Sequence, residues 1–288
     1  MQVRPSPVTA GREHISRRST LMLLGAGLAG AAMRAVAAPA SAPVLNYLDA
    51  DGIARTFKPL SKAPITPLKR SVGLSSRHFQ WTASAQEVVD LAKRAGYDAI
   101  AWAVQPGGHV DPQSVEQDLP RVVEMTRRAG LVVDLVETQL NDSSGPLAEA
   151  LVRTLQRLRI RYYRAGQFGY DYGADIATQI EAVKRRIGGL ADLNARHGVT
   201  ALFQNRSTQG DFGADIWDLW LALRDVDPGL VAIDYDLGHA TVRSGRSGWI
   251  DGLALARRHV RAVSVRDFKW NLGDPIVPTA PIWRPWWT

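Results

Sequence analysis

A single unit recurs from Ser71 onward and limits the folds that this chain can adopt. Each unit is a short apolar run, then a polar loop, then an amphipathic stretch at helical spacing. The apolar runs predict strands at 71–75, 99–104, 131–136, 161–165, 200–204, 230–235 and 262–266. The stretches between them predict helices at 85–95, 114–129, 146–158, 174–197, 214–224 and 247–259. Strands that are apolar on both faces and alternate with helices are typical of a parallel sheet covered by helices.

Residues at the ends of several predicted helices support this division. Typical helix-start residues precede two helices (Ser84, and Asp142 with Ser143). Glycines follow three helices, the one after Ser84 among them (Gly96, Gly130 and Gly198). The pattern favours a (β/α)8 TIM barrel over a doubly wound sheet, because no phosphate-binding glycine motif follows the first strand. After Asp267 the sequence offers one short apolar run at 275–277 and no helix. We therefore predict a barrel that is incomplete at its eighth unit.

The first 37 residues resemble a twin-arginine export signal. Ser16-Arg17-Arg18 precede a glycine- and alanine-rich apolar stretch at 21–33, which is too short for a membrane anchor. Residues 35–37 (AVA) offer a cleavage site, and residues 38–40 (APA) offer a second. We predict a signal peptide at 1–37, an extended Pro/Ala-rich arm at 38–70 and the barrel at 71–288. The twin-arginine machinery is then a partner, and the location is periplasmic or exported.

Composition agrees with export and argues against nucleic acid as a ligand. The sequence contains no cysteine, so no thiol is present to mispair in an oxidising compartment. The net charge of +7 falls to +3 without residues 1–40, because five of the 35 basic residues and one of the 28 acidic residues lie there. So small a positive charge gives little attraction to phosphate backbones. The sequence says nothing about the oligomeric state.

Polar and aromatic side chains follow every predicted strand, at the end of a parallel barrel where active sites lie. Carboxylates and imidazoles suit a divalent ion or a polyol, and arginine, amide and tryptophan side chains suit a sugar. We predict Glu137 and His239 as catalytic residues, and Asp236 and Asp267 as metal ligands. The predicted substrate contacts are Trp102, His109, Arg164, Asn205, Arg206 and Arg266.

Each of these residues has a structural alternative. Asp236 and Asp267 have the position of helix caps, and His239 that of a hydrogen-bonded loop histidine. Glu137 has a barrel arginine such as Arg164 as a potential partner. The tryptophans, Trp102 among them, have the positions of core residues.

Several segments resemble the bacterial sugar phosphate isomerase/epimerase family, whose barrel is xylose-isomerase-like. They are GLSSRHFQWT, GGHVDP, LRIRYYRAG, LADLNARHGVTALFQNRS, DYDLGHATVRSGRSGW and VSVRDFKW, which together span Lys69 to Trp270. The Asp-x-x-His after the sixth strand and the Arg-Asp-Phe-x-Trp after the seventh are the most specific.

The resemblance implies a divalent metal such as Mn²⁺, Mg²⁺, Zn²⁺ or Co²⁺ at the barrel mouth. In the family the metal is held by a Glu after strand five, an Asp after strand six, a His on strand seven and a Glu on strand eight. Asp236 matches the family Asp, and His239 matches a histidine that contacts the substrate. Gln204 stands at the first position as a weaker ligand, Ser264 stands at the third, and the fourth has no counterpart.

The leading hypothesis is therefore an isomerase or epimerase of a sugar or sugar derivative, acting by metal-assisted proton transfer next to a carbonyl. The alternative is a non-catalytic periplasmic sugar-binding protein on a degraded isomerase barrel, which the substituted ligand positions favour. A metal-dependent endonuclease is a third and weaker hypothesis.

Overall fold

The computed structural model describes residues 45–48, 54–57 and 71–266, and the chain divides into two units, Met1–Leu68 and Lys69–Thr288. In the first unit, β1 (Leu45–Leu48) pairs antiparallel with β2 (Ala54–Phe57), so that Leu45 lies opposite Phe57. This pair falls within the predicted extended arm at 38–70, and the sequence pattern had not indicated it. The predicted signal peptide at 1–37 lies outside the described residues.

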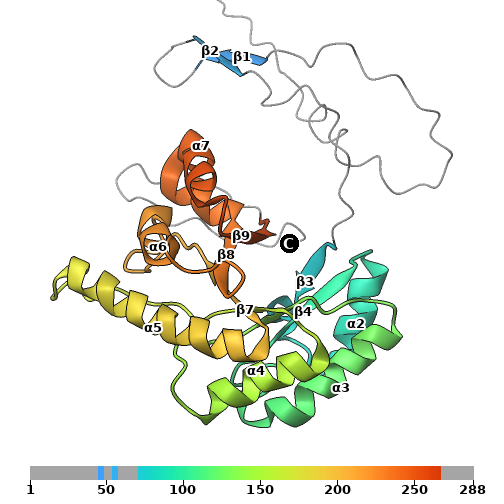
Figure 1. The fold of residues 1–288 in the computed structure, drawn as a ribbon. Coiled ribbons are helices and arrows are strands. Elements are labelled where there is room, and N and C mark those ends of the chain that lie inside the picture. Colours follow the sequence, from blue (N-terminus) through green and yellow to red (C-terminus); the bar gives the residue numbers. More distant parts are fainter. Residues whose placement is uncertain (1–44, 49–53, 58–70, 267–288) are drawn as a thin grey trace, which may run out of the picture. The chain divides into compact units, whose positions relative to one another are not determined.

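The described part of the second unit, residues 71–266, contains one parallel sheet of seven strands, in which every strand pairs with the next strand along the chain (Figure 1). This arrangement confirms the incomplete (β/α)8 fold predicted from the repeat. The strands are β3 (Gly73–Ser75), β4 (Ala99–Ala103), β5 (Leu135–Glu137), β6 (Tyr162–Arg164), β7 (Thr200–Gln204), β8 (Val231–Asp236) and β9 (Val260–Ser264).

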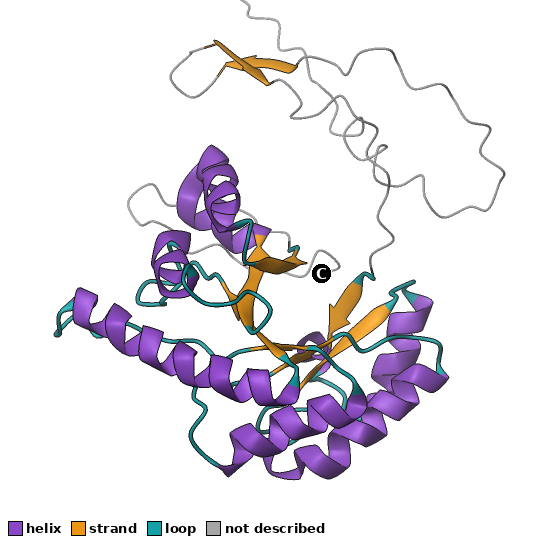
Figure 2. Ribbon diagram, viewed as in Figure 1, coloured by secondary structure: helices purple, strands orange, loops and turns teal. Residues whose placement is uncertain are grey.

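Helices between the strands cover the sheet, and α3, α4 and α5 pack in succession (Figure 2). The α-helices are α2 (Ala85–Arg94), α3 (Val115–Arg128), α4 (Pro146–Leu158), α5 (Ile176–His197), α6 (Ile216–Leu223) and α7 (Leu237–Ala256), and the 3-10 turns are η1 (Ser76–Phe79) and η2 (Pro112–Ser114). The strands β4, β7 and β8 are buried at every position, as the continuous apolar runs predicted. No helix of the described ranges is long and apolar enough to cross a membrane.

The predicted helix ends are mostly correct. Ser84 caps α2 by accepting a hydrogen bond from the Glu87 N–H, and Gly96, Gly130 and Gly198 follow their helices with positive φ. Gly145, rather than Asp142 or Ser143, is the cap residue of α4, and Pro146 fills its first turn.

The last helix begins much earlier than predicted. Helix α7 starts at Leu237, directly after β8, whereas the apolar periodicity placed its start at Ser247. Gly245 interrupts it with a φ of 70°, so two helical pieces meet at a kink. The first piece continues the strand end without a loop, and it therefore carries His239 over the end of the sheet.

The sheet ends at β3 on one side and at β9 on the other. No pairing of these two strands occurs within residues 71–266. Val72 and Val263, at the two edges, are 60% and 54% exposed. The run at 275–277 that we considered for an eighth strand lies outside the described residues.

Candidate functional site

Five polar side chains come from the last residues of five neighbouring strands. These residues are Glu137, Arg164, Gln204, Asp236 and Ser264, which end β5 to β9 in order. Because the strands are parallel and in sequential order, their ends lie at one rim of the sheet. Two hydrogen-bonded clusters, one around Arg164 and one around Asp236, form at this rim.

The first cluster is a buried ion pair network centred on Arg164. Its Nη1 donates to Glu137 Oε1 at 2.6 Å, and its Nη2 and Nε donate to Asp234 Oδ2 at 2.6 and 2.9 Å. The side chains of both carboxylates are 1% exposed. The acidic neighbours raise the pKa of Arg164 against the opposing effect of burial. Arg164 therefore carries a permanent charge that fixes both carboxylates.

The two carboxylate oxygens of Glu137 differ in their hydrogen bonding. Oε1 accepts the short bond from Arg164, whereas Oε2 accepts no hydrogen bond from any residue that the structure describes. Arg77, at the mouth on η1, places its Nε 3.2 Å from Oε2 and is 32% exposed. On the other side of the network, Ser264 Oγ donates to Asp234 at 2.9 Å.

The second cluster is centred on Asp236. Its Oδ2 lies 2.6 Å from Arg266 Nη2 and accepts from Gln204 Nε2 at 2.8 Å, and its Oδ1 accepts from the His239 N–H at 2.9 Å. Asn205 holds the backbone of the same residue through two hydrogen bonds, of 2.7 and 3.0 Å. Burial raises the pKa of Asp236, and the Arg266 guanidinium opposes that shift.

The imidazole of His239 is 5% exposed and sits among cations. Burial lowers the pKa of His239 to about 3, with Arg266, Arg206 and Arg164 acting in the same direction. Its Nδ1 lies 2.9 Å from the Ser207 hydroxyl, which sets the ring orientation. Burial also lowers the pKa of His78, the residue after Arg77. Both rings are therefore neutral at physiological pH.

The structure brings together most of the residues predicted from the sequence. Those that lie in or beside the two clusters are Glu137, Arg164, Gln204, Asn205, Arg206, Asp236, His239 and Arg266. Asp267 lies outside the described residues. The structural alternatives for Glu137 and Asp236 are also present, since Glu137 pairs with Arg164 and Asp236 caps α7.

Trp102 and His109 do not join the clusters. The Trp102 side chain is fully buried, and its Nε1 donates to Thr126 Oγ1 on α3, so it packs between sheet and helix as a core residue. His109 lies edge-on to the Trp102 ring, with its Nε2 3.0 Å from the Thr82 carbonyl oxygen. Neither forms a hydrogen bond or ion pair with the rim clusters within residues 71–266. The position of Trp102 near the end of β4 and that of His109 in the loop after it suggested a rim location, which their side-chain contacts do not show.

Sequence reasoning missed Asp234 as a site residue. It lies two positions before Asp236 on β8, so the period-two alternation of a strand places both side chains on one face. That alternation was a usable signal, but the apolar neighbours made the segment resemble a fully buried strand. Arg77 and Ser207 also contribute, and both are polar residues that follow predicted strands.

The residues at the rim do not fit the divalent metal that the resemblance implies. Each carboxylate of the two clusters lies against a guanidinium, which supplies the positive charge that a metal would supply. Gln204 directs its amide N–H groups toward Asp236, and Ser264 donates to Asp234. No group of three His, Cys, Asp or Glu side chains with metal-ligand geometry occurs among the described residues.

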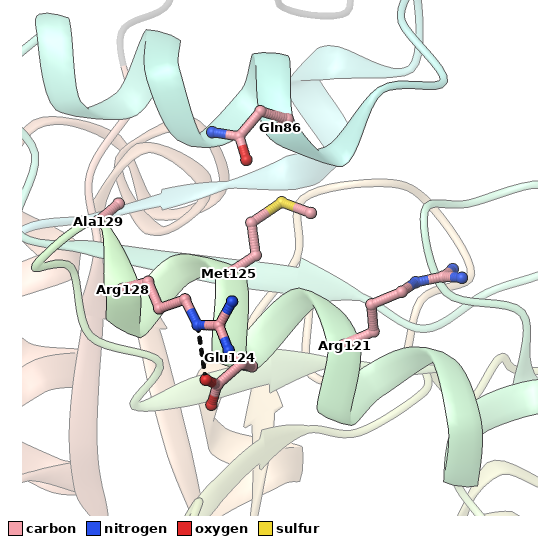
Figure 3. Close-up of a pocket in the computed structure, with 6 residues that line it drawn as sticks. All are labelled: Gln86, Arg121, Glu124, Met125, Arg128 and Ala129. Atoms are coloured by element: carbon pink, nitrogen blue, oxygen red, sulfur yellow. Dashed lines mark hydrogen bonds and ion pairs between the residues drawn. The ribbon is translucent and has the colours of Figure 1, made fainter.

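A separate surface hollow lies on the helical layer, between α2 and α3 (Figure 3). It measures about 470 Å³ and is lined by Gln86, Arg121, Glu124, Met125, Arg128 and Ala129. Arg128 is paired with Glu124 at 2.8 Å in its wall. None of the rim residues lines it, so it is distinct from the candidate site.

Comparisons with solved structures agree with this architecture. Similar structures include a 3-keto-D-glucoside 4-epimerase from E. coli, with 14% identity, a TM-score of 0.55, and coverage of 69% of this chain and 80% of that one. A D-psicose 3-epimerase has 14% identity, a TM-score of 0.55 and coverage of 72% and 77%. An L-ribulose 3-epimerase has 18% identity, a TM-score of 0.52 and coverage of 68% and 70%. At these identities the likeness shows the fold.

No curated protein matches the sequence significantly. A family model described as "Xylose isomerase-like TIM barrel" matches residues 89–285, which is more than half of the chain and includes all the strands from β4 to β9. The sequential parallel sheet and the sequence match agree, and the chain belongs to the xylose isomerase-like TIM barrel family.

Proposed function

We propose that this protein is an isomerase or epimerase of a sugar or sugar derivative, acting by proton transfer next to a carbonyl. Family membership supports the proposal, as do the structural neighbours named above, which are epimerases of a 3-keto-D-glucoside, D-psicose and L-ribulose. The observation that carries it is the asymmetry of Glu137, a buried carboxylate with one oxygen anchored and one oxygen facing Arg77 without a hydrogen bond.

In the proposed reaction, Glu137 Oε2 accepts the proton from the carbon next to the substrate carbonyl. The electron pair of that C–H bond forms the double bond of an enediolate, and the carbonyl oxygen takes the negative charge. Return of the proton to the other face of the same carbon completes epimerisation. Isomerisation instead returns it to the neighbouring carbon, while the hydroxyl proton of the first carbon moves to the former carbonyl oxygen, so that the carbonyl group changes place. Arg77 must leave Oε2 for this step, and its partial exposure supports such mobility.

The residues around Asp236 would position the substrate and stabilise charge. His239 is neutral, so it can hydrogen-bond a substrate oxygen without changing its own charge. The Arg266 guanidinium, held by Asp236, would stabilise a developing oxyanion. No step is assigned to a metal, because the described donors do not fit one.

A second function, a non-catalytic sugar-binding protein, is favoured by one specific observation. Glu137, Asp234 and Asp236 all lie against guanidinium groups, an arrangement that suits a rigid binding surface as well as a catalytic one.

Solvent hydrogen exchange separates the two functions. The protein without its first 37 residues is incubated in D₂O with keto-sugars such as D-fructose and D-psicose, and NMR follows loss of the signal of the hydrogen next to the carbonyl. An isomerase or epimerase exchanges that hydrogen, and Glu137→Gln abolishes the exchange. Binding of a keto-sugar without exchange identifies a binding protein instead.

We further propose export through the twin-arginine pathway and action in the periplasm on a free sugar. Arg17 and Arg18 before the apolar stretch support this assignment. A reporter fused to residues 1–40 should be exported, and replacement of both arginines by lysine should block export. A reporter that stays inside with both arginines intact contradicts the proposal.

A further inference from the structure

Arg206 differs from the other arginines of the rim because it forms no ion pair with an acidic side chain of the part of the chain that the structure describes. Arg77, Arg164 and Arg266 each lie within 3.2 Å of a carboxylate oxygen. Arg206 forms no ion pair with any described residue, and its Nε is buried without a hydrogen-bond partner. Asp211 acts on it through space without forming an ion pair.

The position of Arg206 is nevertheless well defined. It follows β7 by two residues, and its backbone N–H donates to the Gly213 carbonyl at 3.2 Å, which folds the loop back on itself. Gly213 in turn donates its own N–H to Asp218 at 3.0 Å, at the start of α6. The backbone of Arg206 is therefore held beside the end of β7 by a hydrogen-bonded loop.

Arg206 also lies near the other three guanidinium groups. Burial is the main cause that lowers the pKa of Arg206, and the charges of Arg266, Arg77 and Arg164 lower it further. A partly buried cation among other cations is unfavourable in the free protein, because it loses part of its hydration and gains no ion-pair partner. A ligand that supplied an anion at Arg206 would offset this cost.

One guanidinium group of the described rim has no carboxylate with which it forms an ion pair. Four guanidinium groups stand against the three carboxylates that form ion pairs with them, those of Glu137, Asp234 and Asp236, while Asp211 acts on Arg206 only through space and the imidazoles of His78 and His239 are neutral. A single negative charge would balance this set. A carboxylate meets that need and matches the planar fork of a guanidinium, with which it forms two parallel hydrogen bonds.

We propose that the ligand of this site is a sugar acid, whose carboxylate pairs with Arg206 while its hydroxyl and carbonyl oxygens face the Glu137 and Asp236 clusters. The inference rests on the sugar site of the proposed function and names its substrate class. A neutral sugar would leave Arg206 unpaired, and a phosphate dianion would exceed the charge available.

Binding measurements on the protein without residues 1–37 test this inference. The probes are D-glucuronate and D-galacturonate, their neutral parents D-glucose and D-galactose, and D-glucose 6-phosphate, each measured by titration calorimetry at low salt. We expect at least one uronate to bind about tenfold to a hundredfold more tightly than its neutral parent. Arg206→Gln should abolish that preference, and the matched control Arg128→Gln, on the outer face of α3, should retain it.

Three results would overturn the inference: equal binding of uronate and neutral sugar, a preference that survives Arg206→Gln, or tighter binding of the sugar phosphate. Thermal unfolding without ligand gives a second readout. Arg206→Gln should unfold at the same or a higher temperature, because a partly buried cation without an ion-pair partner is removed, whereas a lower temperature would show a structural role and overturn the inference. If uronates bind through Arg206 but no solvent exchange occurs, the isomerase proposal fails and the ligand assignment stands.

Discussion

The guanidinium of Arg164 holds two buried carboxylates together, so replacing it with methionine should strongly reduce the free energy of unfolding. The variant keeps a side chain of similar length but leaves Asp234 without an ion-pair partner among the described residues and Glu137 with Arg77 alone, and the side chains of both carboxylates are 1% exposed. Three short hydrogen bonds to charged oxygens are lost. Each such bond contributes about 1.5–3 kcal/mol, but they act as one unit and do not add. Breaking a buried ion pair from one side typically costs about 3–5 kcal/mol, which we expect here.

Urea denaturation at pH 7, followed by circular dichroism, measures this loss, and the unfolding temperature should fall by roughly 6–20 °C. The matched control is Arg153→Met, because the ion pair of Arg153 with Glu116 is about half exposed, at 56% and 43%, and should contribute less than about 1 kcal/mol. Adding Asp234→Asn to Arg164→Met should restore part of the loss by removing one uncompensated charge. If Arg164→Met loses no more stability than the control, the assignment of this network as buried and coupled is wrong.

Three further predictions concern the rest of the site. The pKa of His239 falls from 6.5 to about 3 on folding, so between these pH values the unfolded chain binds a proton at this residue and the native protein does not. The free energy of unfolding should therefore fall as the pH drops from about 6.5 toward 3. The unfolding temperature of His239→Gln should depend less on pH over that range than that of the unsubstituted protein. Asp236, whose raised pKa acts in the opposite direction, contributes equally in both proteins. If the unfolding temperatures of the two proteins change with pH in parallel, the His239 ring is not buried as described. Dialysis against EDTA should leave the unfolding temperature unchanged. If elemental analysis finds a stoichiometric divalent metal and its removal lowers the unfolding temperature, the conclusion that the rim residues do not fit a metal is wrong. Gly238→Ala should destabilise by about 1–3 kcal/mol in urea, because its Cβ would lie 2.5 Å from Arg266 Cγ, while the control Gly188→Ala, with open space around it, should be neutral or stabilising.

The fold was largely predictable because its signals are local. Strand β7 at 200–204 and helix α4 at 146–158 have the predicted bounds, since apolar runs and helical periodicity act over a few residues. Helix α7 was predicted ten residues too late, because its first turns contain two glycines and polar residues with weak periodicity. Its start is stabilised by the Asp236 cap, a contact that periodicity does not reveal.

The amino-acid sequence by itself determined that the chain forms a parallel sheet with one polar residue at the end of most strands. It also determined which residue types reach the rim, among them Glu137, Asp236 and His239. Only the tertiary structure decided which charges pair across strands, because Arg164 and Asp234 are 70 residues apart in the chain and meet through the order of the strands. The same packing left Arg206 without an ion pair within residues 71–266 and placed the Trp102 side chain against helix α3. Side-chain direction and long-range charge pairing depend on packing between elements. These two properties decide which of the polar residues at the strand ends form a common site.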